Sequence, residues 1–316
     1  MIRRDFHDLW EKHKRKIYIL LGIIAIILFF VILFQNYFSG LSDNKNKSDD
    51  LQSSYQPTKT VIDGSDVKTE NHEKNANTID EFMKYCNEKN IESAYGMLTD
   101  ECKNNIYPTI DRFNKLFFSS VFSKKREYNI QSWINNSKYT TYRLRITDNI
   151  LATGNYDSSV KYETYITTYK NENSNKISLG DYMYTNYPNK QTKTDILEVT
   201  IIKQNIYISD EEYEIKIKNI SDKTVLLDNL NDSFSIRLVT TDGNAYELYK
   251  DKLFVSNMQI EPEETRTIKL KFQKSASIDK NSSYIRMKKI IKDYDAYNTN
   301  PESYNEERAE IDIKIK

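Results

Sequence analysis

The chain has little histidine, cysteine, glycine or proline. Its 316 residues include three histidines, two cysteines, seven glycines and five prolines. His7, His13 and His72 all precede the segments in which we expect folded domains. This distribution removes Ser–His and Cys–His nucleophile pairs, histidine proton shuttles and histidine-ligated zinc from the expected chemistry. Carboxylates remain the candidates for acid–base work.

Net charge is also missing, because 46 basic residues balance 46 acidic ones. Basic residues gather only within residues 3–16. A nucleic-acid partner is therefore not expected, since such proteins carry a basic patch. The scattered glycines form neither a G-x-G-x-x-G motif nor a P-loop, so no cofactor is expected. The 24 tyrosines, in contrast, are typical of a fold rich in β-strands.

One long apolar run covers residues 17–34 and contains no charged side chain. A helix of about 20 apolar residues crosses a bilayer. Because cations precede the run and a polar tract follows it, we expect residues 1–16 in the cytoplasm, a transmembrane helix at 17–38, and everything later outside the cytoplasm. A cleaved signal peptide is the alternative. Its apolar region would be shorter, about 7–15 residues, and would end in a small-residue cleavage site, which residues 38–41 match poorly.

The next segments predict a stalk and then an α+β domain. Residues 39–76 are polar, with hardly any apolar periodicity, and predict a flexible stalk. From Thr78, a capping box with Glu81 and apolar side chains at helical spacing predict three helices. After residue 126 the period changes to two and predicts successive antiparallel strands. Helices that cover one face of such a sheet make an α+β domain, expected at residues 77–188.

The last segment predicts an all-β domain at residues 195–316. Apolar and polar residues alternate there in short runs, and residues 240–244 carry a strong hairpin signal. Short strands separated by turns every 8–12 residues or so indicate a β-sandwich. Residues 293–308 are expected to form a long loop before the last strand.

The first domain resembles the cone-shaped fold of the nuclear transport factor 2 superfamily, also called SnoaL-like. The resemblance rests on residues 82–87 (FMKYCN), residues 93–99 (SAYGMLT), Phe113 and the strands that follow. Enzymes of that superfamily usually place an Asp or His in the cone. No catalytic residue of this chain matches that pattern, so the resemblance implies binding or assembly rather than turnover.

The second domain resembles the immunoglobulin-like domains of bacterial envelope proteins. Residues 213–223 end a strand in an Asn-x-Ser-Asp turn, and residues 260–272 lead through a proline into an alternating strand. With its anchor, the whole arrangement is similar to TcpC-like and VirB-type conjugation proteins. It differs from TcpC-like proteins in having a β-sandwich where a second domain of the first kind would be expected.

Few residues are candidates for a site. Cys86 and Cys102 could form a disulfide outside the cytoplasm, or could be two buried thiols. The acidic run 210–212 has no glycine nearby, as a calcium loop would need, and is expected to be a solvated turn rather than a metal site.

Tyrosines on the strands of the first domain are the other candidates. Tyr142, Tyr162 and Tyr165 could line a binding face, or they could be ordinary sheet packing. Because Tyr162 and Tyr165 are three apart on one strand, we expect them on opposite faces of the sheet.

The expected function is binding. The sequence indicates a single-pass membrane protein of the bacterial cell envelope that acts as a scaffold or binding protein, through self-association or another envelope protein, and possesses no enzymatic activity. A role in conjugation, a ligand-sensing role and a carboxylate-dependent enzyme in the cone remain the alternatives.

Overall fold

The structure is a computed structural model of the chain. It describes residues 59–62, 64–148, 160–170, 175–276, 281–302, 304 and 308–315. The expected cytoplasmic tail and transmembrane helix, and residues 39–58 of the expected stalk, lie outside the described residues. Across the described ranges, no helix combines the length and apolarity needed to cross a membrane.

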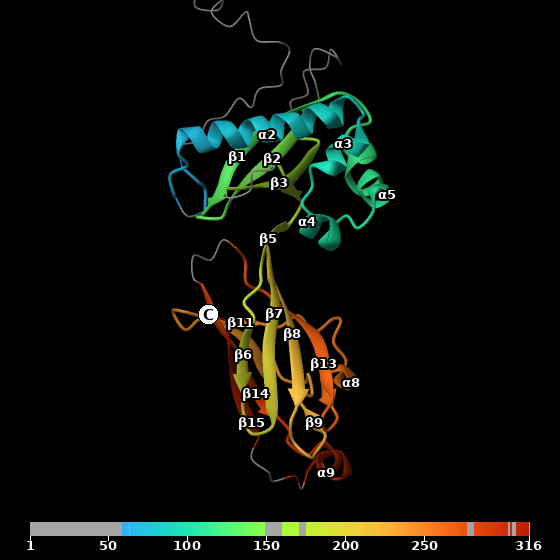
Figure 1. Ribbon diagram of the computed structural model, residues 1–316, viewed down its shortest axis with the longest axis vertical. Helices are drawn as coiled ribbons and strands as arrows, with labels where there is room; N and C mark the ends of the chain where they lie inside the picture. The colour runs from blue at the N-terminus through green and yellow to red at the C-terminus, as the bar shows by residue number, and fades with distance from the viewer. Residues whose placement is uncertain are drawn as a thin grey trace, which may run out of the picture. The chain divides into compact units, whose positions relative to one another are not determined.

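The helices precede the first sheet. The longest, α2 (Thr69–Asn87), lies across one face of the sheet (Figure 1). The shorter helices that follow are α3 (Ile91–Gly96), α4 (Asp100–Asn105), α5 (Ile110–Phe113), the π-helical turn η1 (Asn114–Phe118) and α6 (Ser119–Val121). The side chains of Asn90, Thr99 and Thr109 cap α3, α4 and α5 by accepting a backbone N–H.

Helix α2 begins eight residues before the expected domain start at residue 77, and this corrects two expectations. Thr78 is not an N-cap: it lies inside α2, where its hydroxyl donates to the Lys74 carbonyl at 3.1 Å. His72 is not in a stalk: it is buried, with its ring 5.8 Å from that of Tyr142. The folded part of the chain therefore does contain a histidine. The sequence hid this turn because the residues it buries, His72 and Asn75, are polar.

The first sheet is antiparallel, in the order β1-β2-β3-β4. Its strands are β1 (Arg126–Asn135), β2 (Tyr139–Asp148), β3 (Tyr162–Tyr169) and β4 (Ile177–Leu179). Ile130, Leu144 and Ile166 are fully buried on the side that the helices cover. Mixed helices and antiparallel strands thus confirm the α+β class, although β-structure dominates the chain.

The chain leaves the first sheet at Gly180. Residues 176–184 are expected to form one strand, but the structure divides them between β4 and β5 (Tyr182–Asn186). Gly180 has a φ of +96°, which a residue with a side chain rarely adopts. Strand β5 then pairs with β7 (Leu197–Tyr207), in the second part of the fold. The second fold therefore takes up residues that precede its expected start at residue 195.

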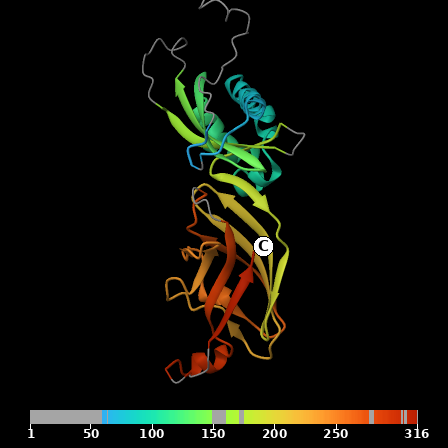
Figure 2. The same ribbon diagram turned by 90° about the vertical axis from the view of Figure 1, so that its left-hand side faces the viewer.

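Two antiparallel sheets form a β-sandwich. The first has the order β13-β8-β7-β5, with β6 also paired to β7, and the second has the order β11-β10-β14-β15. Figure 2 shows these strands in side view, with the ribbon running to the C-terminus at β15. The remaining bounds are β6 (Lys190–Lys193), β8 (Glu211–Asn219), β9 (Val225–Leu226), β10 (Ile236–Thr240), β11 (Ala245–Glu247), α8 (Val255–Met258), β12 (Gln259–Ile260), β13 (Thr265–Phe272), β14 (Ser282–Ile290), α9 (Tyr294–Thr299) and β15 (Ala309–Lys314).

Helix α9 lies in the segment that is expected to be a loop, residues 293–308. The Asp293 side chain caps it by accepting the Ala296 N–H at 3.0 Å, and this donated hydrogen bond holds the pKa of the Asp293 carboxyl below its ordinary value. The one sequence feature that could have predicted this helix is Asp293, a residue type that commonly caps helices. The segment has no helical run long enough to show a periodicity.

Three apolar clusters organise the described chain. One lies between the two sheets of the sandwich, and one lies between the helices and the first sheet. A smaller third cluster joins Ile134 and Tyr139 of the first sheet to Met183 of β5, with Ile206 and Ile208 packed against it. The described residues of both sheets belong to one compact unit.

Candidate functional site

The expected binding-face tyrosines do not share a surface. Tyr142 is fully buried and its hydroxyl accepts a hydrogen bond from Asn75 Nδ2 at 3.0 Å. Burial raises its pKa to about 12, although the Asn75 bond works in the opposite direction. Tyr142 is therefore part of the core and cannot contact a partner.

Tyr162 and Tyr165 lie on opposite faces of β3, as expected. Tyr162 packs edge-on against Phe117 on the helix side, with ring centroids 5.7 Å apart. Tyr165 is half-buried on the other side, 5.8 Å from the ring of Trp133. Only Tyr165 of the three candidates is thus placed for contact on the face away from the helices.

Both cysteines are free thiols inside the first core. The backbone N–H of Leu179 donates to Cys102 Sγ at 3.4 Å. Burial raises the pKa of Cys102 to about 11 and that of Cys86 well above its ordinary value. A thiol that stays protonated is neither a nucleophile nor a metal ligand, so the structure gives these residues a packing role.

The most elaborate polar site lies in a cleft of about 890 Å³, which we call the Glu211 cleft. One wall is the β1–β2 turn, and a second is β5 with the segment after it. The third comes from the sandwich, at Gln204, Glu211, Lys274 and Ser282. The lining of the cleft includes Lys138, Tyr139, Tyr184, Asn186, Tyr187, Lys190, Gln204, Glu211, Lys274 and Ser282. Tyr187 is 57% exposed at this site.

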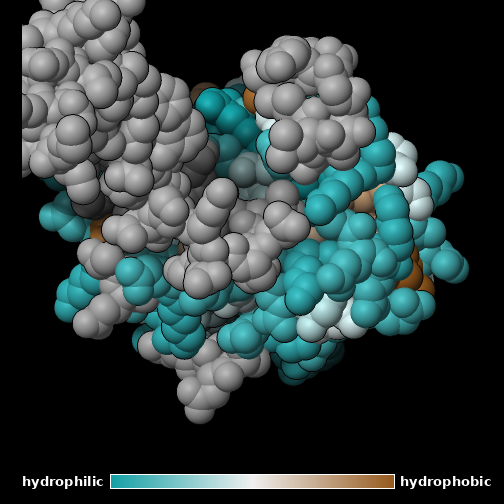
Figure 3. Space-filling view, turned by 90° about the horizontal axis from the view of Figure 1, so that it is seen from above, coloured by the Kyte–Doolittle hydropathy of each residue, from teal (hydrophilic) through white to brown (hydrophobic). Residues whose placement is uncertain are grey.

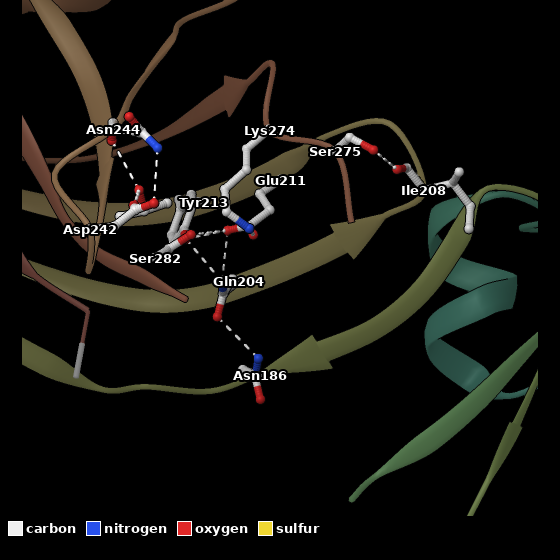
Figure 4. A network of polar contacts seen from close by, with 11 residues as sticks. Asn186, Gln204, Ile208, Glu211, Tyr213, Asp242, Asn244, Lys274, Ser275 and Ser282 are labelled. Atoms are coloured by element: carbon white, nitrogen blue, oxygen red, sulfur yellow. Dashed lines mark hydrogen bonds and ion pairs between the residues drawn. The ribbon is translucent and has the colours of Figure 1, made fainter. Parts of the chain in front are cut away.

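Four donors surround the carboxylate of Glu211 (Figure 4). Lys274 Nζ donates to Oε1 at 2.7 Å. Oε2 accepts from Tyr213 OH at 2.6 Å, from Ser282 Oγ at 2.8 Å and from Gln204 Nε2 at 3.0 Å. Glu211 and Lys274 are each 4% exposed, so this ion pair is held almost entirely out of water.

The network continues to the surface. Gln204 Oε1 accepts from Asn186 Nδ2 at 3.0 Å, and Asn186 Oδ1 accepts from Lys138 Nζ at 2.6 Å. The Lys138 ammonium also lies 4.9 Å from the centre of the Tyr184 ring. One polar chain therefore connects the turn of the first sheet with the buried ion pair of the sandwich.

Catalysis would require a free base in this cleft. Ser282 and Glu211 have the separation of a nucleophile and its base, but Glu211 already receives three other hydrogen bonds, one of them from an ammonium. Both carboxylate oxygens are therefore already committed to fixed donors of the fold. Burial, together with the charge of Glu211, raises the pKa of Tyr213 well above its ordinary value, so that hydroxyl remains a donor. The arrangement is suited to holding structure and presenting a surface.

The acidic run at 210–212 is not the solvated turn expected from the sequence. Asp210 and Glu211 are both buried, and they point to different sites because successive side chains of a strand alternate. Glu211 shares the inward parity of Tyr213 and Ile215, which was a usable signal for its burial. Among the described residues, no cluster of three or more His, Cys, Asp or Glu side chains is arranged to hold a metal ion.

Comparison with known proteins leaves the chain without a family. No family model and no curated protein matches it. Among solved structures, a conserved hypothetical protein from Bacillus anthracis is 16% identical, with 43% of this chain and 98% of that one covered at a TM-score of 0.26. A functionally unknown protein from Listeria monocytogenes EGD-e is 14% identical, with 42% and 86% covered at a TM-score of 0.28.

A third solved structure is an uncharacterized beta-sandwich protein from Clostridium difficile 630. It is 15% identical, with 31% of this chain and 81% of that one covered at a TM-score of 0.22. Scores this low do not bear on what the present chain does.

Proposed function

We propose that this chain is a membrane-anchored binding or scaffold protein of the bacterial cell envelope, and that it holds its partner at the Glu211 cleft without turning it over. The observation that carries the proposal is the saturated carboxylate: four donors occupy Glu211, in a cleft that is otherwise lined by groups suited to contact. The apolar run at residues 17–34 would supply the anchor, with the described part outside the cytoplasm.

The architecture supports this reading by resemblance. Helices on one face of a four-stranded sheet are the arrangement of nuclear transport factor 2-like domains, and an immunoglobulin-like sandwich is a common module for presenting surfaces. In this chain the helix side of the first sheet is filled by buried side chains, among them Tyr142 and Phe117. Because buried side chains fill the helix side of the sheet, binding is favoured over catalysis in a cone. Membership of a conjugation apparatus would be one specific case of the proposed binding role.

The partner we propose is a segment of another envelope protein or of a second copy. The cleft offers the rings of Tyr139, Tyr184 and Tyr187, and the ammonium groups of Lys138 and Lys190. Rigid aromatic side chains supply contact area at low entropic cost. By contrast, the face of the molecule seen from above is mostly hydrophilic where it is coloured, with hydrophobic residues only in small separate spots (Figure 3).

The test uses the full chain in its membrane. Tyr187→Ala and Lys138→Glu change the exposed part of the cleft. Leu116→Ala removes an apolar side chain on η1 that is also exposed, at 47%. Partner capture or self-association should weaken in the first two variants and persist in the third. Equal retention in all three would remove the cleft from the proposal. Turnover of a peptide, ester or wall glycan that disappears in Ser282→Ala would favour the enzyme instead.

A further inference from the structure

We propose a second, separate binding site on the outer side of the sandwich, one that takes a neutral saccharide. It is a cleft of about 800 Å³ between the outward face of β13 and the loop that precedes α8, and we call it the Asp210 cleft. The proposal does not depend on the Glu211 cleft, because the two clefts share no lining residue. Its lining includes Asp210, Glu212, Tyr249, Asp251, Lys252, Leu253, Asn257, Ile268, Lys269 and Lys271.

An unused acceptor is built into this site. Asp210 is only 5% exposed, and its Oδ2 accepts from Ser209 Oγ at 2.8 Å and pairs with Lys271 Nζ at 3.1 Å. The other oxygen, Oδ1, is buried and has no hydrogen-bond partner in the described part of the chain. An unsatisfied buried acceptor costs about 1–3 kcal/mol, so a ligand that donates a hydrogen bond to it would recover that free energy.

The second element is an aromatic ring at the mouth of the cleft. Tyr249 is 36% exposed, and its backbone N–H donates to the Lys271 carbonyl at 2.8 Å, which places this residue beside β13. The Lys271 ammonium lies 5.2 Å from the centre of the Tyr207 ring and 5.8 Å from that of Tyr249. The ring and the charge are therefore positioned before any ligand arrives.

The loop has an internal backbone bond, from the Leu253 N–H to the Lys250 carbonyl at 2.9 Å. Helix α8, which follows it, is fixed by Asn257 Oδ1, which accepts from the Phe254 N–H at 3.2 Å, and by Arg266 Nη1, which donates to the Ser256 carbonyl at 2.7 Å. A pre-formed cleft loses little conformational entropy on binding.

The charges of the lining select the class of ligand. Three carboxylates (Asp210, Glu212 and Asp251) face three ammonium groups (Lys252, Lys269 and Lys271), so the lining is neutral as a whole. A cation and an anion would each meet three like charges here, so neither sign gains from the lining as a whole. A hydroxyl group both donates and accepts, so it can bridge a carboxylate and an ammonium without adding charge. A chain of hydroxyl groups with one apolar ring face, which could lie on Tyr249, is a neutral saccharide.

The experiment titrates the full chain in detergent micelles with four neutral tetrasaccharides: maltotetraose, cellotetraose, mannotetraose and tetra-N-acetylchitotetraose. Calorimetry or ligand-observed NMR would report the affinity. We expect at least one of them to bind at millimolar concentration or below, and Tyr249→Ala to weaken that binding about tenfold, the upper range for one aromatic contact. Tyr187→Ala, which changes the Glu211 cleft, is the matched control and should leave the affinity unchanged.

A second variant tests the carboxylate of the cleft independently of Tyr249. Asp210→Asn should also weaken saccharide binding, and its melting temperature will show whether the fold is retained. Failure of all four saccharides to bind the wild-type chain would overturn the proposal. So would binding that survives Tyr249→Ala, or that falls as much in Tyr187→Ala. Tighter binding of a charged tetragalacturonate than of any neutral chain would overturn the assigned class.

Discussion

Removal of the Lys274 ammonium should lower the stability of the fold by an amount that can be estimated from the structure. Lys274→Met keeps most of the volume of the side chain. It leaves the carboxylate of Glu211 buried with only its three neutral hydrogen-bond donors, since the ammonium is lost. Breaking a buried ion pair at one partner costs about 3–5 kcal/mol, because the remaining charge is uncompensated. Since three hydrogen bonds still reach Glu211, we expect the lower end, about 3 kcal/mol.

Urea or thermal unfolding of the full chain measures this cost. For a folded region of this size, about 3 kcal/mol corresponds to a fall in melting temperature of about 6–12 °C. Lys218→Met is the matched control: Lys218 also pairs with a carboxylate, that of Glu263 at 2.9 Å, but both side chains are largely exposed. Such pairs contribute little, so the control should melt like the wild type.

A double variant completes the design. Glu211→Gln combined with Lys274→Met removes both charges, and it should be more stable than Lys274→Met alone because no unpaired charge remains buried. If Lys274→Met proved as harmless as Lys218→Met, then Glu211 would not be a buried charge in the folded chain. The Glu211 cleft would then not be organised around a buried ion pair.

Three further predictions concern the first core and the topology. The free energy of unfolding should fall as the pH rises from 10 toward 12, because burial raises the pKa of Tyr142 from 10.0 to about 12 and the unfolded chain releases that proton first; Tyr142→Phe should flatten this fall, and an identical profile would contradict it. Cys86 and Cys102, both free and buried, should resist alkylation in the folded chain and react fully in denaturant without reductant; incomplete labelling in denaturant would indicate a disulfide. External protease on wall-stripped cells should digest the region after residue 40 and spare residues 1–16; a protected C-terminal part would reverse the orientation.

Periodic side-chain patterns account for most of what the sequence predicts correctly. The strands β8 and β13 alternate strictly, with Ile215 and Leu270 inward, and the structure places them as neighbours. The expected opposite orientation of Tyr162 and Tyr165 follows from the same period. Where an element has a regular apolar face, the side chains that it buries can be read directly.

Elements that bury polar side chains were missed. The first turns of α2 pack His72 and Asn75 against Tyr142, and an apolar period cannot show this because the partner lies 67 residues later. Gln204 was hidden for a different reason. A register shift between Ile201 and Lys203 reverses which residues of β7 face inward, and nothing local in the sequence marks it.

The candidate site was partly readable. Glu211 has the parity of the buried residues of β8, and Lys274 has the parity of Leu270 and Phe272, so both could have been assigned to the inside. Their pairing could not, because it depends on how the end of β13 returns to the β7–β8 turn. That return is fixed by backbone hydrogen bonds such as Ala276 N–H to the Ile208 carbonyl at 2.9 Å.

Photo-crosslinking from position 187 tests the central claim most directly. A photoreactive phenylalanine analogue would replace Tyr187 in the full chain, and a second version would carry it at Leu116, which is exposed on η1. In intact cells we expect a discrete protein adduct from position 187 that disappears in the Lys138→Glu background, and no such adduct from position 116. No adduct from position 187, or the same adduct from both positions, would contradict a partner held at the Glu211 cleft.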